Sequence, residues 1–174
     1  MPAMFPKLLE AFPGFVKLNT DGSAKGNPGS AGFGGVIRDE TGRWIKGFFG
    51  YIGVCSSIVA ELWAIREGLR IMAELNHPYI IVESDCETAI SLLKGSSLKD
   101  SAHTALLEDS WHYASKMRSC IFSHTLREGN KCADMAANMG VNQSIGLNIM
   151  ESPPVEMSPL LVADMASVAF ERLS

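Results

Sequence analysis

Four carboxylates of this sequence, Asp21, Glu61, Asp85 and Asp134, have positions and spacing that could form one chemical site. Asp21 and Asp85 each follow a strand-like run, and the loops that leave one edge of a sheet bring such residues together. Clustered carboxylates repel one another unless cations lie between them. Oxygen ligands select Mg²⁺ or Mn²⁺ over zinc. The pattern therefore predicts a site for hard divalent cations.

Taken singly, these acids have plainer structural interpretations. Asp21 and Asp85 could be turn residues, which commonly follow strands. Asp134 falls in the first turn of a predicted helix, where the helix dipole favours an anion. Glu61 lies beside the apolar stripe of its helix, either as a rim residue or as a buried carboxylate that needs a partner. The joint occurrence of all four, with no obvious local Lys or Arg partner, favours the metal site.

The elements that would position the first three acids change from a strand period to a helix period. Residues 15–21 alternate as a strand, the Gly-rich segment 22–32 is predicted to be a turn, and residues 33–53 form a hairpin of two strands. A helix is predicted from Ser56 or Ser57, as N-cap, to about residue 76. Residues 79–85 then form an almost wholly apolar strand that is buried on both faces.

Further elements alternate in the same way up to residue 140. We expect helices over 86–95 and about 101–116, a strand near 118–126, and a helix from Asn130 to Gly140. Beyond residue 140 the periodicity fails, and three prolines fall within 151–159. We therefore predict an N-terminal lead (1–14), an α/β domain (15–140) and a partly ordered C-terminal tail (141–174) with a short helical turn near 160–166.

Length and composition narrow the possible classes of protein. The 174 residues, 47% of them hydrophobic, suit one globular domain, and a net charge of −4 argues against holding nucleic acid by bulk electrostatics alone. The four cysteines form no C-x-x-C pair, so neither a disulfide scaffold nor a zinc site is indicated. No apolar run is long enough for a signal peptide or a membrane span. We expect a soluble intracellular protein without a membrane partner, in the nucleus or the cytoplasm.

Four segments carry a resemblance to a known family. NTDGSAKGNPG (19–29), AELWAI (60–65), VESD (82–85) and HTLREGNKCAD (124–134) are similar to the motifs of type 1 ribonuclease H. The resemblance is strongest to plant ribonuclease H-like domains, found alone or at the C-terminus of retroelement reverse transcriptases, and it covers about residues 15–140. It implies an α/β ribonuclease H-like fold, with a five-stranded mixed sheet in the order 3-2-1-4-5 and helices on both faces.

The same resemblance implies a function and a set of site residues. Asp21, Glu61, Asp85 and Asp134 would hold two Mg²⁺ ions, for which Mn²⁺ can substitute, and the protein would hydrolyse the RNA strand of RNA/DNA hybrids as a monomer. His124 would assist by moving a proton or releasing product. The substrate contacts implied by the resemblance are Gly22, Ser23, Asn27, Ser56, Ser57, Glu87 and Asn130.

Two other interpretations stay open at this point. Segment 95–118 is electrically neutral where some relatives carry a basic protrusion, and position 87 is Glu where bacterial members carry Gln. The neutral segment and the irregular tail beyond residue 140 favour a domesticated retroelement fragment that binds nucleic acid or protein with little or no catalysis. Glu87 would weaken binding of the hybrid or change its pH dependence. Another nuclease or a transposase on the same fold is the third interpretation, although such proteins rarely combine TDGSAKGNPG with the REGN-x-x-AD ending.

Overall fold

Six strands form one mixed sheet in the order β5-β4-β1-β2-β3-β6. The computed structural model describes residues 14–95, 102–143 and 146–173. Neighbours among β1, β2, β3 and β6 are antiparallel, whereas β4 and β5 run parallel to β1. The predicted order 3-2-1-4-5 is confirmed, and β6 is an additional strand beside β3. The strands are β1 (Val16–Gly26), β2 (Gly29–Arg38), β3 (Trp44–Cys55), β4 (Tyr79–Ser84), β5 (Ser119–His124) and β6 (Gly146–Met150).

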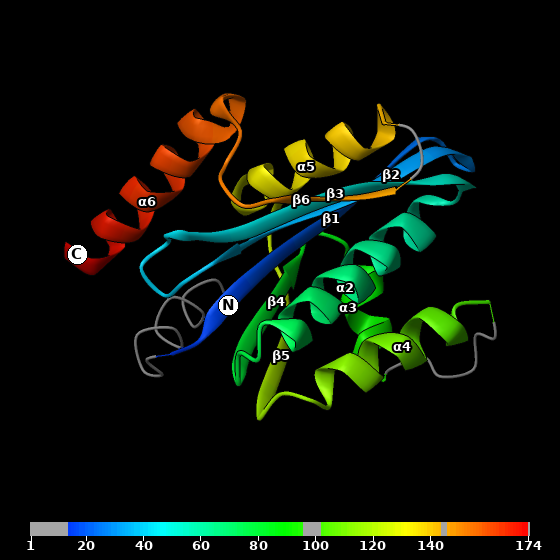
Figure 1. Ribbon diagram of the computed structural model, residues 1–174, viewed down its shortest axis with the longest axis horizontal. Coiled ribbons are helices and arrows are strands. Elements are labelled where there is room, and N and C mark those ends of the chain that lie inside the picture. Colours follow the sequence, from blue (N-terminus) through cyan, green and yellow to red (C-terminus); the bar gives the residue numbers. More distant parts are fainter. Residues whose placement is uncertain (1–13, 96–101, 144–145, 174) are drawn as a thin grey trace.

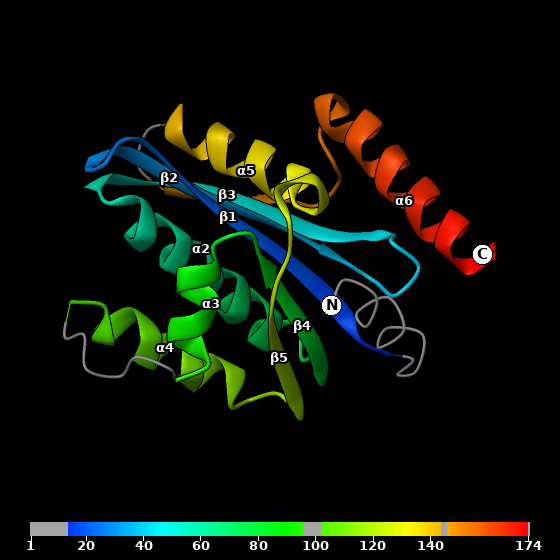
Figure 2. The same ribbon diagram turned by 180° about the vertical axis from the view of Figure 1, so that it is seen from behind.

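Helices cover both faces of the sheet, as predicted (Figures 1 and 2). On one face α2 (Ser57–Glu74) crosses β1, with α4 (Thr104–Ala114) packed against it and α3 (Glu87–Leu93) beside both. On the other face α5 (Lys131–Val141) lies on β1 and β2, and α6 (Ser158–Leu173) follows beyond it. Two short 3₁₀ helices, η1 (Arg127–Gly129) and η2 (Val155–Met157), lead into α5 and α6. None of the helices in the described ranges is long and apolar enough to cross a lipid bilayer.

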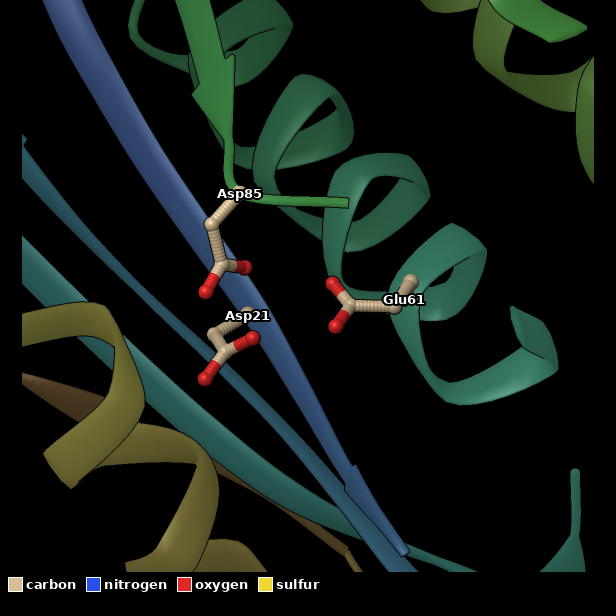
Figure 3. A group of neighbouring side chains, drawn as sticks. All are labelled: Asp21, Glu61 and Asp85. Atoms are coloured by element: carbon tan, nitrogen blue, oxygen red, sulfur yellow. The ribbon is translucent and has the colours of Figure 1, made fainter. Parts of the chain in front are cut away.

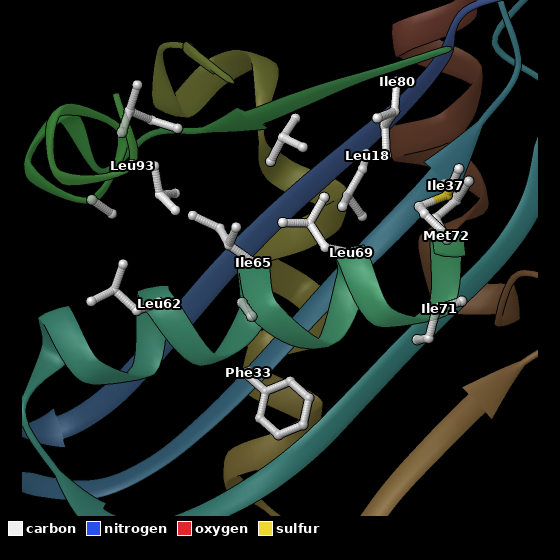
Figure 4. Packing of buried hydrophobic residues seen from close by; sticks show 14 of the residues in the cluster. Leu18, Phe33, Ile37, Leu62, Ile65, Leu69, Ile71, Met72, Ile80 and Leu93 are labelled. Carbon is white, nitrogen blue, oxygen red and sulfur yellow. The ribbon is translucent and has the colours of Figure 1, made fainter. Parts of the chain in front are cut away.

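The largest apolar core lies between α2 and the sheet. Leu62, Ile65 and Leu69 lie along α2 in the same apolar cluster as Leu18 of β1, Leu69 is beside Leu18, and all four side chains are fully buried (Figure 4). The helix begins where the sequence predicts, because the Ser56 hydroxyl oxygen accepts a hydrogen bond from the Val59 amide at 3.4 Å. Burial of one helix stripe thus holds α2 across β1.

The Gly-rich segment after Asp21 is strand rather than the predicted turn. β1 continues to Gly26, β2 starts at Gly29, and only two residues connect them. The reason is close packing: a β-carbon on Gly22 would lie 2.3 Å from the carbonyl carbon of Ala60, and one on Gly34 would lie 2.5 Å from that of Ala136. These glycines let α2 and α5 approach the two faces of the hairpin, so they serve packing between layers instead of chain reversal.

The C-terminal segment is more regular than the sequence indicates. Residues 146–150 form β6, which pairs with residues 47–51 of β3, and the short helical turn expected near 160–166 is the 16-residue helix α6. Met157, fully buried, packs with Val36, Phe49 and Ala136 in a second cluster on the α5 face. Residues 1–13 of the predicted lead and the start of the helix predicted from 101 lie outside the described residues.

Candidate metal centre

The strand register places two of the predicted acids side by side. In the parallel pairing of β1 with β4, Thr20 lies opposite Ser84, so the next residues are Asp21 and Asp85. β4 ends at Ser84, whereas β1 continues beyond Asp21. Asp21 therefore stands inside a long strand, in contrast to the strand end predicted for it, and Asp85 stands at the carboxyl end of β4 as predicted.

The third acid reaches the same point from α2. Glu61 is 9% exposed, and its Oε2 is buried without a hydrogen-bond partner among the described residues. One oxygen each of Asp21, Glu61 and Asp85 lies within 4.8 Å of the others, and the three side chains point toward one another (Figure 3). Three carboxylates, one from β1, one from α2 and one from the residue after β4, thus converge on one small volume.

Burial and mutual repulsion disfavour full ionisation of this cluster. Burial raises the pKa of Asp21 far above its ordinary value, and the carboxylates of Glu61 and Asp85 raise it further. Burial also raises the pKa of Glu61, and Asp85 adds to that shift, while hydrogen bonds to Asp21, Gly22 and Ser84 oppose it. A divalent cation would offset both effects, and the all-carboxylate donor set with an unpartnered buried oxygen fits Mg²⁺ or Mn²⁺.

Two other predicted residues border this cluster. Asp134 lies in the first turn of α5 and is exposed; its carboxylate falls outside the group of three, but it interacts with Asp21. His124, the exposed last residue of β5, has Nε2 3.3 Å from the backbone oxygen of Asp85. The structure therefore places all five predicted catalytic residues near one another. Asp21, Glu61 and Asp85 form the cluster, and the exposed Asp134 and His124 border it.

The predicted substrate contacts fall into separate places. Asn27, in the β1–β2 turn, accepts a hydrogen bond from the Ser57 amide at 3.0 Å, which ties the hairpin tip to the start of α2 beside Ser56. Ser23 donates to Asn138 Oδ1 at 3.0 Å.

Gly22 and Glu87 are close in sequence to two of the acids. Gly22 is partly buried against the backbone of α2. Glu87 is exposed in the first turn of α3, two residues after Asp85. Both residues are thus close to the acids in sequence, but of the two only Glu87 is exposed to solvent.

Asn130, which the resemblance assigns to substrate binding, lies in the interior of the protein. It is 2% exposed, and its Nδ2 donates to the Thr20 carbonyl oxygen at 2.9 Å. It also directly precedes α5, although its side chain makes no capping hydrogen bond. A side chain that is enclosed and engaged in this way holds α5 against β1, so a direct substrate contact, as predicted from the resemblance, does not fit its position.

Three residues near the acids were missed from the sequence. Asn138 donates to Asp134 Oδ1 at 3.4 Å and lies four residues later on α5, a spacing that could have revealed it. Arg127 is 93% exposed with Nε 3.9 Å from Asp85 Oδ2, and Ser84 is buried against Glu61. No periodic signal marks either of these two, since both depend on contacts between distant segments.

Comparison with known proteins decides the family. The model of the family described as "Reverse transcriptase-like" matches residues 19–140, which is well over half of the chain. This chain belongs to the reverse transcriptase-like family. The predicted resemblance to type 1 ribonuclease H is also confirmed, because curated relatives are named ribonuclease H and similar solved structures are named RNase H1.

Two curated relatives and one solved structure illustrate the similarity. An Arabidopsis thaliana protein named "Putative ribonuclease H protein" is 40% identical over 152 residues, covering 87% of this chain and 24% of that protein. The chain thus spans about a quarter of the length of this relative. Ribonuclease H of an Acidovorax species is 29% identical over 153 residues, covering 75% of this chain and 97% of the relative. LC11-RNase H1, solved in complex with an RNA/DNA hybrid, superposes with a TM-score of 0.68 at 28% identity, covering 73% of this chain and 96% of that one.

Proposed function

We propose that this chain is an endonuclease that hydrolyses the RNA strand of RNA/DNA hybrids with two Mg²⁺ ions. The observation that carries the proposal is the convergence of Asp21, Glu61 and Asp85, with ligand oxygens within 4.8 Å of one another and one buried oxygen unpartnered. Such a cluster is costly to maintain without a cation, so its presence favours metal-dependent chemistry. Relatives named ribonuclease H, and a neighbour solved with an RNA/DNA hybrid, support the choice of substrate.

The proposal gives each acid a role that its position supports. Asp21, Glu61 and Asp85 would hold the ions from the buried side, and Asp134 would complete the ligand set from the exposed turn of α5. When bound, the two ions supply the positive charge that activates an attacking water and stabilises the leaving oxygen of the RNA strand. Mn²⁺ would substitute for Mg²⁺ because both prefer oxygen ligands.

Residues on the open side would handle protons and the substrate backbone. His124 is exposed beside Asp85 and would move a proton or assist product release. Asn27 and Ser57 meet where the hairpin tip touches the start of α2, with Ser56 as the cap of that helix, and would contact the sugar-phosphate backbone. Gly22, Ser23 and Glu87 would line the approach to the acids.

Strand specificity is the sharpest test of this function. The purified protein is incubated with Mg²⁺ and four substrates: a hybrid labelled on its RNA strand, the same hybrid labelled on its DNA strand, duplex RNA and duplex DNA. The proposal predicts internal cleavage of the RNA strand of the hybrid alone, abolished by a chelator. Binding without cleavage by the folded protein would contradict the proposal and support the domesticated binding module instead.

A further inference from the structure

Arg38 of β2 joins the C-terminal helix to the interior of the sheet. Its side chain is buried, with 8% exposed, and its guanidinium group has two partners. Nη1 donates to Asp164 Oδ2 of α6 at 2.7 Å, and Nη2 donates to Asn19 Oδ1 of β1 at 3.0 Å. A buried cation needs such partners, because an unpaired charge in the protein interior is strongly destabilising.

Asn19 passes this connection on toward the acid cluster. It is 1% exposed and lies two residues before Asp21. Its Nδ2 donates to Glu83 Oε2 at 3.0 Å and to Asn130 Oδ1 at 3.2 Å. Asn130 Nδ2 in turn donates to the Thr20 carbonyl oxygen at 2.9 Å. Both amide side chains are thus fully enclosed, and each uses its donor and its acceptor within the protein.

The last member of this chain of contacts controls the start of α5. Asn130 directly precedes α5, and its backbone oxygen accepts the hydrogen bond of the Asp134 amide at 3.0 Å. The position of Asn130 therefore fixes the first turn of α5, from which the Asp134 carboxylate faces Asp21. Displacement of Asn130 by a fraction of an ångström would move Asp134 relative to the other three acids.

Independent packing holds Asp164 at its end of the network. Met157 is fully buried, and Leu160 and Leu161 pack on the same cluster as Cys132 and Ala136 of α5. Cys132 Sγ also lies 3.7 Å from Asp164 Oδ2. The C-terminal segment is therefore docked by an apolar contact and by an ion pair, and the ion pair is the part that reaches the network.

We infer that α6, through Asp164, sets the geometry of the acid cluster: Asp164, Arg38, Asn19 and Asn130 act together as positioning residues for Asp134. Residues beyond 140 lie outside the match to the family model, so this connection adds an element of the chain to the site. The catalytic consequence rests on the proposed function, but the geometric one does not. Loss of the Asp164 carboxylate would leave the buried Arg38 guanidinium with only one of these two partners, Asn19 Oδ1. A buried cation that has lost its counter-charge is destabilised, so Arg38 would shift, and Asn19 and the Asn130 side chain bonded to it would move with it.

The test compares variants at the two ends of the network. Asp164→Ala removes the partner of Arg38, Asp164→Asn keeps an acceptor oxygen there, and Asn130→Ala reaches the same point without touching α6. Val162→Ala, on the 66% exposed side of α6, is the matched control. Two quantities are measured: amide hydrogen exchange of the first turn of α5 in metal-free protein, and the kcat and KM for hybrid cleavage with Mg²⁺.

Asp164→Ala and Asn130→Ala are both expected to speed exchange of the Asp134 amide and to lower kcat about 10-fold with KM nearly unchanged. Asp164→Asn should recover part of both losses, and Val162→Ala should match the wild type. Faster exchange confined to α6 in Asp164→Ala, with the α5 amides and kcat as in the wild type, would overturn the inference. If the wild-type protein does not cleave the hybrid, the proposed function fails, and the exchange data alone still decide whether Asp164 positions α5.

Discussion

Gly22 lies so close to Glu61 that a β-carbon on Gly22 would stand 2.4 Å from the Glu61 amide nitrogen. This contact brings α2 directly against the strand that carries Asp21. It is the reason that two acids 40 positions apart in the sequence can share one small volume. Packing distance, rather than loop flexibility, thus determines the geometry of the cluster.

Replacement of this glycine should destabilise the folded protein. Gly22→Ala is expected to lower the free energy of unfolding by about 3 kcal/mol, because the new methyl group meets backbone atoms that cannot rotate away. Gly53→Ala is the contrast: nothing lies within 4 Å of its β-carbon, and only its φ of +103° opposes the substitution, at about 1 kcal/mol. Urea unfolding of both variants measures the difference. Equal losses would show that α2 can move away from β1 at low cost.

The repulsion within the cluster should be visible without any metal. Asp21→Asn is expected to raise the free energy of unfolding of the chelator-treated protein by about 1–2 kcal/mol, because it removes a buried carboxylate whose ionisation is opposed by its neighbours. The same variant should lose the thermal stabilisation that Mg²⁺ gives the wild type. Glu108→Gln, an exposed acid on α4, controls for the change in net charge. A less stable Asp21→Asn protein in chelator would contradict the repulsion described here.

This repulsion has a defined pH dependence. The pKa values of Asp21 and Glu61 are raised by folding, so their contribution to stability is fully present below the ordinary carboxyl pKa, near 4, and is lost as pH rises through the raised values. The stability advantage of Asp21→Asn over the metal-free wild type should therefore be larger at pH 8 than at pH 5. Apparent Mg²⁺ affinity of the wild type should increase over the same interval, because the ion binds the deprotonated acids. An advantage that is constant with pH would be evidence against coupled, raised pKa values.

His124 should affect catalysis without affecting metal binding. Its ring is exposed and contacts the backbone oxygen of Asp85 rather than a carboxylate of the cluster. His124→Ala is expected to lower kcat for hybrid cleavage about 100-fold while leaving the Mg²⁺-dependent rise in Tm unchanged. His112→Ala, on the exposed side of α4, should behave as the wild type. Loss of the Mg²⁺ effect on Tm in His124→Ala would instead assign this histidine to the metal site.

The C-terminal segment should contribute substantially to stability. Met157→Ala is expected to lower the free energy of unfolding by about 2–5 kcal/mol, because the Met157 side chain is fully enclosed between α5 and the sheet. Val155→Ala, two residues earlier and 83% exposed, should change stability by less than about 0.5 kcal/mol. Thermal and urea unfolding of the two variants give the comparison. A small effect of Met157→Ala would mean that α6 is only loosely attached.

Elements with strong local patterns could be predicted from the sequence. The alternation of residues 15–21, the 3.6-residue period after Ser56 and the apolar run 79–84 gave β1, α2 and β4, and the motif resemblance ordered the first five strands. β6 could not be found in this way, because Gly146–Met150 is a short edge strand whose partner, β3, lies about 100 residues earlier. The extent of β1 was missed for a related reason, since its glycines are explained by contacts with α2 and α5 that no local pattern reveals.

The sequence predicted the acids and the histidine of the candidate site, but not the buried residues that position them. The four acids and His124 were named from the sequence, and the structure gathers them in one region. Asn130 was assigned to the substrate, whereas its burial and its hydrogen bond to Thr20 assign it to the scaffold. Asn19, Arg38 and Asp164 were not anticipated, because a buried polar network depends on three-dimensional contacts between residues 19 to 126 positions apart.

The most direct measurement is the rate of hybrid cleavage as a function of Mg²⁺ concentration for the wild type and for Asp85→Asn, with Glu108→Gln as the control of equal charge. The account predicts Mg²⁺-dependent cleavage of the RNA strand by the wild type and by Glu108→Gln, and a loss of at least about 1000-fold in Asp85→Asn. Circular dichroism would verify that all three proteins are folded. Cleavage by Asp85→Asn at the wild-type rate, or no cleavage by the folded wild type at any Mg²⁺ concentration, would contradict the claim that these carboxylates form a hydrolytic metal centre.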